Sequence, residues 1–425
     1  AKPESLSSME MNQNRIERVF LIDGPHRMYK SFYAIPGLTT PDGEPINLVY
    51  GVIGSILKLI REERPDYLAV CFDAKGGSFR NDIYSAYKAT RKAPPPEFEQ
   101  QRPMLRRALD TLGIPQIELP GWEADDLLGT LGAQWGSEPS AKRPGRHVYL
   151  GSGDKDLKQL ISPTVSMFDL DTMSALDEEG LFHELGLRPN QVIEYMSLVG
   201  DSVDNVPGVP KVGEKTALPL IQRYESLERL LENLDQLATD DELEVRGKKT
   251  LGKRISEHAQ QARLSRDLVT IRTDAPIDDQ IFLEECRWAG FASRRTEILD
   301  LFNEFGFTNY VRDLGLIEES SLQSVRDRVE VIRTHRQAAA WADRMKKGGA
   351  IAIDLVLGEG GAMRAEPLGL AVAVLDDEEG GVDGGVEAPA AFLPLRPVAG
   401  GTVEESGRGP VSRSVPGADH GRGSS

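Results

Sequence analysis

Three short apolar runs stand out in the first part of the chain, and each ends near an aspartate. They cover residues 18–24, 67–74 and 147–156. Short runs of this kind are typical of strands buried on both faces. Between them, apolar positions recur at helical spacing, over residues 48–62 and 104–112. Strand–helix alternation predicts an α/β fold, with a mainly parallel sheet flanked by helices.

The aspartates at the ends of these runs suggest a common site. Asp23, Asp73 and Asp154 each follow a predicted strand. In open parallel sheets, ligands bind just beyond the carboxyl ends of the strands, so we expect these three side chains to face one crevice. A single aspartate at such a position is usually a turn or helix-cap residue. Three aspartates at three strand ends are not explained by turn or helix-cap roles alone.

Residues 121–126 add three more carboxylates, from Glu123, Asp125 and Asp126. The following leucines have helical spacing, so these acids belong to the start of a helix, where the macrodipole favours negative charge. That explanation would suffice for an isolated acidic turn. However, so many carboxylates meeting at one place would repel one another unless cations lay between them. The pattern therefore predicts a two-metal phosphodiester hydrolase.

Residues 76–98 have a different character, because cations and aromatic residues alternate there. Cations can contact phosphates while aromatic rings stack on bases, which suits a single-stranded nucleic acid. A solvated surface loop is the equally simple alternative. The residues concerned are Arg80, Tyr84, Tyr87, Lys88, Arg91 and Lys92.

A second acidic pair precedes a glycine-rich turn. Asp201 and Asp204 are three positions apart and would share a face of a helical turn. Residues 208–217 then predict a tight hairpin that opens a helix at about Glu214. The backbone N–H groups of such a helix start can bind a DNA phosphate, although an ordinary turn before a helix has the same pattern.

Composition is that of a globular protein of two or three domains, with 425 residues and a net charge of −17. The negative charge does not exclude a nucleic-acid partner, because binding depends on local charge. Cys71 and Cys286 are too few for a zinc site. No apolar stretch is long enough to span a membrane, and residues 1–17 lack the apolar core of a signal peptide. We expect a cytoplasmic, nucleoid-associated protein without membrane contact.

Residues 19–316 resemble the 5′-nuclease domain of bacterial DNA polymerase I and the related flap endonucleases. The matching segments are 21–24, 72–75 with 79–80, 87–89 with Arg91, 121–126, 153–157, 200–208 and 213–217. Their order and spacing make the resemblance far more specific than any single motif. It implies a PIN-like 5′-nuclease fold with a helical helix-hairpin-helix subdomain, and a helical arch through which a 5′ strand passes. It also implies a 5′–3′ exonuclease or 5′-flap endonuclease that acts in DNA repair and primer removal.

The resemblance also implies roles for individual residues. Two or more Mg²⁺ ions, with Mn²⁺ as a substitute, would bind, and Asp23 would be a metal-binding residue that lies between two groups of ligands. The ligands of one would be Asp73, Glu123, Asp125 and Asp126, and those of the other Asp154, Asp156, Asp201 and Asp204. Lys88 and Arg91 would act with Asp23 in catalysis. The expected contacts to 5′-flap, nicked or 5′-ended duplex DNA are Lys30, Lys75, Arg80, Tyr84, Tyr87, Lys88, Arg91, Gly208, Lys211, Gly213, Lys215 and Thr216.

The chain departs from the family pattern at a few positions. Lys211 replaces the usual first glycine of the hairpin turn, which would strain a lysine if the position requires a positive φ. Asp354-Leu355-Val356 stands where the next polymerase domain, a 3′–5′ exonuclease, has Asp-Thr-Glu. We therefore expect that later region to be inactive. A truncated polymerase and a free-standing nuclease both remain open.

The expected domain organisation follows from these assignments. It comprises a flexible N-terminus at residues 1–17, an α/β catalytic domain at 18–185 and a helical DNA-binding subdomain at 186–316. A linker at 317–328, a partial 3′–5′ exonuclease-like domain at 329–393 and a disordered tail at 394–425 complete it. We expect a monomer. A non-catalytic scaffold that binds DNA structures is the main alternative, and a phosphatase of small esters is a weaker one that leaves the basic segment and the hairpin unused.

Overall fold

The structure is a computed structural model. It describes residues 15–35, 37–140, 143–277, 283–316, 329–347, 350–357, 367–375 and 390–394. The chain divides into two compact units, Ala1–Leu316 and Ile317–Ser425, and each is considered by itself. We predicted a flexible N-terminus at residues 1–17, a linker at 317–328 and a disordered tail at 394–425. Residues 1–14, 317–328 and 395–425 lie outside the described residues. The first and last of these predictions are wrong at their inner ends, because Ile16 and Glu17 begin one strand and Pro394 ends another.

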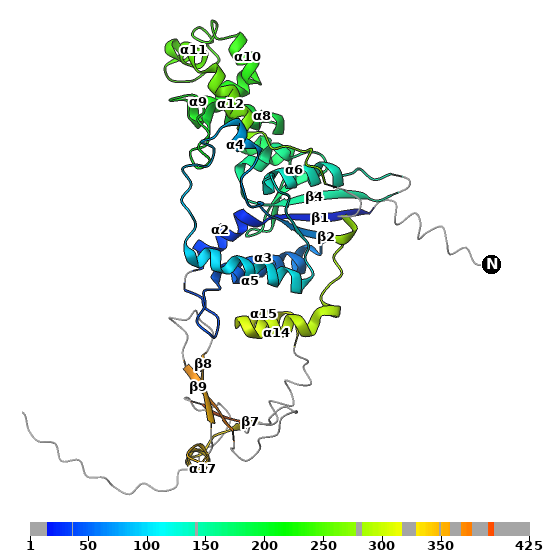
Figure 1. The fold of residues 1–425 in the computed structure, drawn as a ribbon, viewed down its shortest axis with the longest axis vertical. Helices are drawn as coiled ribbons and strands as arrows, with labels where there is room; N and C mark the ends of the chain where they lie inside the picture. The colour runs from blue at the N-terminus through cyan, green and yellow to red at the C-terminus, as the bar shows by residue number, and fades with distance from the viewer. Residues whose placement is uncertain are drawn as a thin grey trace, which may run out of the picture. The chain divides into compact units, whose positions relative to one another are not determined.

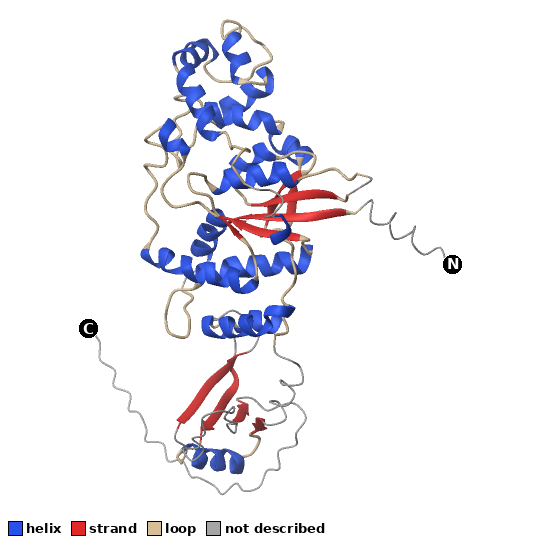
Figure 2. Ribbon diagram, turned by 45° about the vertical axis from the view of Figure 1, so that its right-hand side comes forward, coloured by secondary structure: helices blue, strands red, loops and turns tan. Residues whose placement is uncertain are grey.

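A sheet flanked by helices organises the first unit (Figures 1 and 2). It has six strands in the order β3-β2-β1-β4-β5-β6. All neighbours are parallel except β6, which runs antiparallel to β5. This confirms the predicted α/β fold with a mainly parallel sheet, and it adds three short strands that the sequence pattern did not reveal. The strands are β1 (Ile16–Asp23), β2 (Tyr67–Cys71), β3 (Gln116–Ile117), β4 (Gly145–Gly151), β5 (Val165–Asp169) and β6 (Ser174–Leu176).

Helices cover both faces of the sheet because successive strand residues point to opposite sides. Phe20 and Ile22 of β1 pack with α2 (Gly24–Ala34), α3 (Asn47–Glu63) and α5 (Pro96–Leu112). Val19 and Leu21 instead join the core that contains α6 (Ala124–Trp135). The helix predicted at 104–112 is longer than expected, since α5 begins at Pro96, a residue suited to a first helical turn. Two further helices, α14 (Arg295–Phe305) and α15 (Thr308–Asp313), belong to the first of these cores.

A helical part with its own apolar core follows the sheet. The two helices before Gly200 are α7 (Glu178–Leu185) and α8 (Pro189–Val199). The predicted helix start at about Glu214 is confirmed. The remaining elements of this part are α9 (Glu214–Tyr224), α10 (Leu227–Glu232), α11 (Lys248–Glu257) and α12 (Ala259–Val269).

The segment between Asp201 and Val206 differs from the prediction. It is a turn closed by an isolated bridge between these two residues, in which each backbone N–H donates to the other's carbonyl, at 2.9 and 2.7 Å. The expected helical turn is therefore absent. Asp201 and Asp204 still meet, because the Oδ1 of Asp201 accepts the backbone N–H of Asp204 at 3.3 Å.

The second unit contains a four-stranded sheet in the order β7-β10-β9-β8 and one described helix. Asp354 belongs to β8, whose backbone pairs antiparallel with β9. Identification of this unit as a partial exonuclease-like domain stays a prediction. Its elements are β7 (Val329–Val331), α17 (His335–Met345), β8 (Ala350–Leu357), β9 (Pro367–Leu375) and β10 (Ala390–Pro394). Among the helices that the structure describes, none is long and apolar enough to cross a membrane.

Candidate active site

Four aspartates from different parts of the sequence line one pocket of about 630 Å³. Asp23 ends β1, Asp73 follows β2, Asp125 is in the first turn of α6, and Asp154 follows β4. Their convergence results from the parallel sheet, which brings the carboxyl ends of β1, β2 and β4 to the same edge. The predicted crevice of strand-end acids is therefore present.

Asp23 is both a helix cap and a member of this group. Its Oδ1 accepts the backbone N–H of His26 at 2.9 Å, which caps α2, and its Oδ2 accepts the Ser152 hydroxyl at 2.7 Å. Burial raises the pKa of Asp23 to about 6, against the opposing effect of these donors. The same carboxylate therefore caps α2 and lines the acidic pocket.

Asp125 is the carboxylate whose charged form is most clearly disfavoured by its neighbours. Burial raises its pKa well above the usual range, and the charges of Asp23, Asp154 and Asp73 raise it further. Lys88 opposes this shift. Asp73 is held in place by the backbone N–H of Ala124, which donates to its Oδ1 at 2.8 Å. The pocket therefore gathers carboxylates that repel one another when they are charged.

A second group of acids lies beside the first. The 3-10 helix η1 (Lys155–Leu160) carries Asp156, whose backbone N–H donates to the Oδ1 of Asp154 at 3.0 Å. Burial and the charge of Asp154 raise the pKa of Asp156 to about 8. Its buried Oδ1 has no hydrogen-bond partner. Asp201 differs, because Lys155 contacts it at 2.8 Å and lowers its pKa despite its burial.

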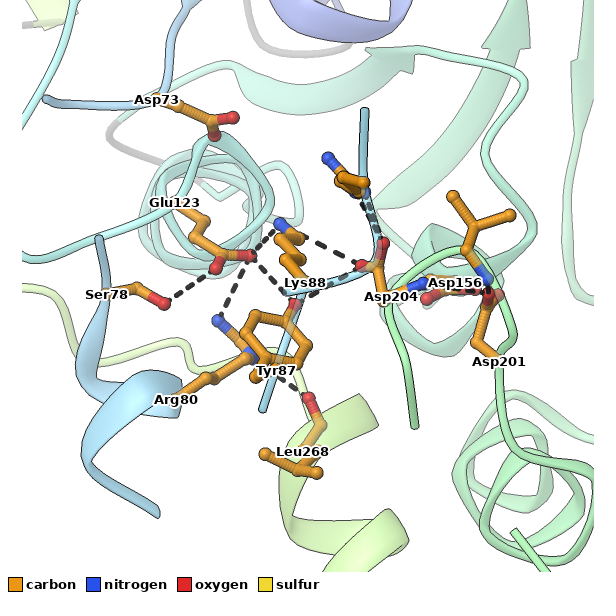
Figure 3. Close-up of polar contacts among 12 residues, drawn as sticks. Asp73, Ser78, Arg80, Tyr87, Lys88, Glu123, Asp156, Asp201, Asp204 and Leu268 are labelled. Atoms are coloured by element: carbon orange, nitrogen blue, oxygen red, sulfur yellow. Dashed lines mark hydrogen bonds and ion pairs between the residues drawn. The ribbon is translucent and has the colours of Figure 1, made fainter. Parts of the chain in front are cut away.

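The basic segment supplies cations to these acids (Figure 3). The Nζ of Lys88 lies 2.8 Å from Glu123 and 3.8 Å from Asp204, so it bridges the two groups. Arg91 donates through its Nε to Asp204 at 2.8 Å. Although burial opposes the change, Lys88 and Arg80 lower the pKa of Glu123. Lys88, Arg91 and Lys75 also line the pocket, where the sequence placed them.

Lys88 is held in an uncommon backbone conformation. Its φ is +56°, and its backbone N–H donates to the carbonyl oxygen of Asp204 at 2.9 Å. The amide of Asn205 donates to the carbonyl oxygen of Ala86 at 2.7 Å. A non-glycine residue at positive φ persists only where its surroundings fix it, and such positions concentrate at functional sites. The turn at Asp201–Val206 therefore fixes the backbone of Lys88, whose side chain reaches Glu123.

Three of the predicted site residues have other partners. Arg80 and Tyr87 are only 2% and 5% exposed, so neither can contact DNA in this conformation, and both face Glu123 instead. Asp126 is fully buried, and both of its oxygens accept hydrogen bonds from Arg80. The expectations that Arg80 and Tyr87 contact DNA and that Asp126 binds metal are therefore wrong for this conformation. Buried charges are normally paired, and the ion pair between Arg80 and Asp126 explains why both side chains can be buried.

The remaining predicted DNA contacts lie outside the lining of the acid pocket. Tyr84 is half-buried against the core that contains α6. Lys30, on α2, pairs with Asp171. The hairpin residues Gly208, Lys211, Gly213, Lys215 and Thr216 precede or begin α9. None of these positions is tested by the pocket geometry, so their contacts to DNA stay predictions.

The hairpin shows two backbone requirements. A Cβ atom at Gly208, where φ is +58°, would lie 2.5 Å from the Val199 carbonyl group, so only glycine fits there. No atom would come within 4 Å of a Cβ at Gly213, which leaves the backbone at the start of α9 open to a ligand. Lys211 has a φ of +63°, so the position does need the left-handed conformation that the sequence left in doubt.

We expect Lys211→Gly to stabilise the protein. The left-handed conformation costs a lysine about 1–2 kcal/mol, and the greater chain entropy of glycine in the unfolded state offsets part of this gain. The net increase in the free energy of unfolding should be about 0.5–1 kcal/mol, measurable by urea titration. Lys215→Gly, within the first turn of α9, is the matched control and should have the opposite sign. Equal destabilisation by both changes would contradict the assignment of strain.

Several residues that sequence reasoning did not single out shape the site. Ser152 donates to Asp23, and its Oγ accepts the backbone N–H of Asp154 at 3.0 Å, so one hydroxyl links two carboxylates. Ser78 donates to Glu123 at 2.6 Å. His26 lines the pocket from α2. Only Ser152 had a signal in the sequence, because it lies within the short loop before Asp154.

Comparison with known proteins identifies the family. Residues 18–186 match the family described as 5′-3′ exonuclease, N-terminal resolvase-like domain, and residues 187–293 match 5′-3′ exonuclease, C-terminal SAM fold. DNA polymerase I of Pseudomonas aeruginosa is 34% identical over 410 residues, 93% of this chain and 42% of that protein. The thermostable DNA polymerase I of Thermus thermophilus is 40% identical over 301 residues, 71% of this chain and 34% of that protein.

Among solved structures, a zinc-bound T5 5′-exonuclease is similar at 18% identity and a TM-score of 0.46, and the match covers 68% of this chain and 99% of that one. The chain thus spans less than half the length of the two polymerases compared above. The two matched segments are contiguous and contain every carboxylate of the site. The chain belongs to the 5′–3′ exonuclease family.

Proposed function

We propose that this chain hydrolyses DNA at 5′ ends and 5′ flaps with the help of bound Mg²⁺. The observation that carries the proposal is the convergence of Asp23, Asp73, Asp125 and Asp154 on one pocket whose lining also contains Lys88 and Arg91. Carboxylates suit hard divalent cations, and the two cations suit the phosphate of a substrate. A binding scaffold for a polyanion would gain nothing from clustered carboxylates, because they repel phosphate.

The donor set fits divalent metal ions. Asp125 is crowded by like charges, and a buried oxygen of Asp156 lacks a partner, so both would be stabilised by a cation. Within the described residues, no group of three or more histidine, cysteine or acidic side chains is arranged to hold a metal ion in this conformation, so the carboxylates must shift toward an ion when it binds. An open, oxygen-lined pocket suits Mg²⁺, which keeps several waters and shares its ligands with substrate phosphates. Mn²⁺ prefers the same oxygen ligands.

We assign two groups of ligands. Asp23, Asp73, Asp125 and Glu123 would hold one metal, and Asp154, Asp156, Asp201 and Asp204 would hold or orient the other. Bound metals of this class activate water as the nucleophile and stabilise the leaving oxygen of a phosphodiester. Glu123 and Asp204 share Lys88 in the present conformation, and Lys155 contacts Asp201. Each of these carboxylates therefore already has a cation of the chain beside it.

The basic residues of the pocket position the substrate. Lys88 and Arg91 carry charges that can neutralise the scissile phosphate, and their pairing with Glu123 and Asp204 raises the pKa of both despite their burial. They therefore stay protonated throughout the working pH range. The αL backbone at Lys88 and its bond to Asp204 reduce the freedom of this side chain before DNA binds. Such preorganisation limits the entropy that must be lost in the transition state.

Cleavage assays on 5′-flap, nicked and blunt duplexes, side by side and with Mg²⁺ present, test the proposed function. We expect 5′-phosphorylated mononucleotides or short oligonucleotides from the flap and nicked substrates. A phosphatase of small esters would instead hydrolyse a small phosphate ester in the absence of DNA. Binding of all three duplexes without any cleavage would favour the scaffold and overturn the proposal.

For Lys88→Ala we expect turnover of a 5′-flap duplex to fall by about 10²-fold, because one preorganised cation is lost from the transition state. The dissociation constant for the duplex without metal should change by less than about threefold, since DNA affinity is shared by many phosphate contacts. Single-turnover kinetics and fluorescence anisotropy measure the two quantities. Lys253→Ala is the control, because Lys253 is exposed and its only ion pair joins it to Glu257 within the described part of the chain. Equal losses in turnover and binding would refute the catalytic role of Lys88.

A further inference from the structure

Arg80 lies where three parts of the first unit meet. Its guanidinium donates to both carboxylate oxygens of Asp126, at 2.7 and 2.8 Å. It also donates to the carbonyl oxygens of Leu268 and Thr270, at 2.8 and 2.9 Å. These two acceptors belong to the last residues of α12 and the segment that follows it. The guanidinium therefore ties the start of α6 to the end of α12.

Asp126 has no capacity left for another ligand. Its Oδ1 accepts from Arg80 and from the backbone N–H of Arg272, at 2.9 Å, and its Oδ2 accepts from Arg80 and from the backbone N–H of Glu123, at 3.3 Å. Each carboxylate oxygen has two lone pairs, so all four are in use. Asp126 thus fixes the backbone of Glu123 on one side and that of Arg272 on the other.

A second tether reaches the same stretch from the other group of acids. The amide nitrogen of Gln159 donates to the carbonyl oxygen of Asp156 at 3.0 Å and to that of Val269 at 2.8 Å. Its Oε1 accepts the backbone N–H of Ile271 at 2.9 Å. Gln159 therefore connects η1, which carries Asp156, to the end of α12.

The same helix also holds the beginning of the hairpin. The Oγ of Ser265 accepts the backbone N–H of Gly208 at 3.0 Å, and Gln261 donates to the carbonyl oxygen of Gly208 at 2.7 Å. Gly208 lies two residues after Val206, where the turn that contains Asp201 and Asp204 ends. Residues 261–272, here called the α12 strut, thus contact all three segments that bear the proposed metal ligands of α6, η1 and the turn.

We propose that Arg80, Asp126 and Gln159 are positioning residues that fix the distance between the two groups of carboxylates through the α12 strut. This inference rests on the nuclease function proposed above. Its physical basis is that the two groups of carboxylates repel one another and come from separate elements. Contacts from another part of the chain must therefore hold them at a fixed distance. Misplacement of reacting groups by about 1 Å can cost on the order of 10²-fold in rate.

Two variants remove the tethers without removing a proposed ligand. Arg80→Lys keeps the charge but cannot make four hydrogen bonds in a fixed fork, and Gln159→Leu keeps the side-chain volume but removes the amide. For each we expect kcat on a 5′-flap duplex with Mg²⁺ to fall by about 10- to 100-fold. KM, and the dissociation constant of the duplex in EDTA, should stay within about twofold. A substrate-contact role for Arg80 would instead weaken DNA binding and reduce its salt dependence.

Hydrogen exchange of the protein without DNA or metal tests the strut independently of activity. Both variants should accelerate exchange of the amides of Ile271, Arg272 and the turn residues 201–206. Normal exchange at the turn in both variants would overturn the inference even if the wild-type protein cleaves DNA. Conversely, a wild-type protein that fails to cleave with Mg²⁺ overturns the proposed function, whatever the exchange data show.

Two further proteins keep the test decisive. If Arg80→Lys does not fold, the double variant Arg80→Met/Asp126→Leu replaces the buried pair by apolar residues of similar size, so that neither charge is left buried without its partner. It should fold, lose kcat and show the same exchange at the turn. Arg107→Lys is the matched control, since Arg107 makes a similar two-bond ion pair with Glu304, at 2.6 Å, on the surface. A wild-type rate in the double variant, or an equal loss in the control, would contradict the positioning role.

Discussion

Asp125→Asn should reduce cleavage of a 5′-flap duplex by about 10³-fold or more while the protein becomes more stable. Asp125 is crowded by Asp23, Asp73 and Asp154, so a neutral amide at this position relieves repulsion in the absence of metal. We expect the melting temperature in EDTA to rise by a few degrees, which corresponds to about 1 kcal/mol for a domain of this size. The loss of activity arises because a neutral amide is a far weaker ligand for a hard cation than a carboxylate.

The two readouts together separate a metal ligand from a structural residue. Loss of a structural residue would lower both the melting temperature and the activity. Asp154→Asn should reduce cleavage to a similar extent, because Asp154 lines the same pocket. Asp300→Asn, at an exposed position on α14, serves as the control and should change neither quantity. Near-normal cleavage by both Asp125→Asn and Asp154→Asn would end the metal assignment.

Removal of divalent metal should have the second large effect. In EDTA we expect cleavage to fall below detection, at least about 10³-fold, and to return when Mg²⁺ or Mn²⁺ is added. Binding of the flap duplex should persist, because the hairpin backbone and the basic residues do not depend on the metal. Mg²⁺ should also raise the melting temperature of the wild-type protein, since an ion at 100 times its dissociation constant stabilises by about 2.7 kcal/mol.

The change in melting temperature on addition of Mg²⁺ tests whether Asp125 takes part in metal binding. The stabilisation by Mg²⁺ should be smaller in Asp125→Asn, because one of the repelling charges that the ion offsets is already gone. Cleavage that persists in EDTA would contradict a metal-dependent mechanism. Absence of cleavage under all metal conditions, together with tight flap binding, would favour the non-catalytic scaffold.

The fold and the acidic pocket were largely predictable from the sequence. Apolar runs ended by Asp23, Asp73 and Asp154 were sufficient to predict parallel strands whose carboxyl ends meet, and the pocket contains all three. The reason is local: a strand buried on both faces must be apolar throughout, so the first charged residue after it marks the sheet edge. The strands β3 and β6 escaped detection because two or three residues carry too little pattern, and β5 escaped because Ser166 interrupts its apolar run.

Arg80 and Asp126 show where sequence reasoning failed. Both stand among residues with plausible contacts to substrate or metal, and a charged residue is rarely fully buried unless it is paired. Their partner groups are 46 positions apart in the sequence, and the other acceptors, Leu268 and Thr270, are backbone carbonyls. Nothing in a single sequence reveals an ion pair formed across such separations.

The sequence by itself determined the α/β class, the carboxylate-rich pocket at the strand ends and the hairpin that opens α9, because each depends on residue types that follow one another along the chain. Only the tertiary structure decided which charged side chains face the pocket and which form buried ion pairs. It also decided how residues 261–272 connect the segments that carry the acids. The physical reason is that pairing of charges depends on distance in space, which packing of the helices against the sheet sets and which the order of residues leaves open.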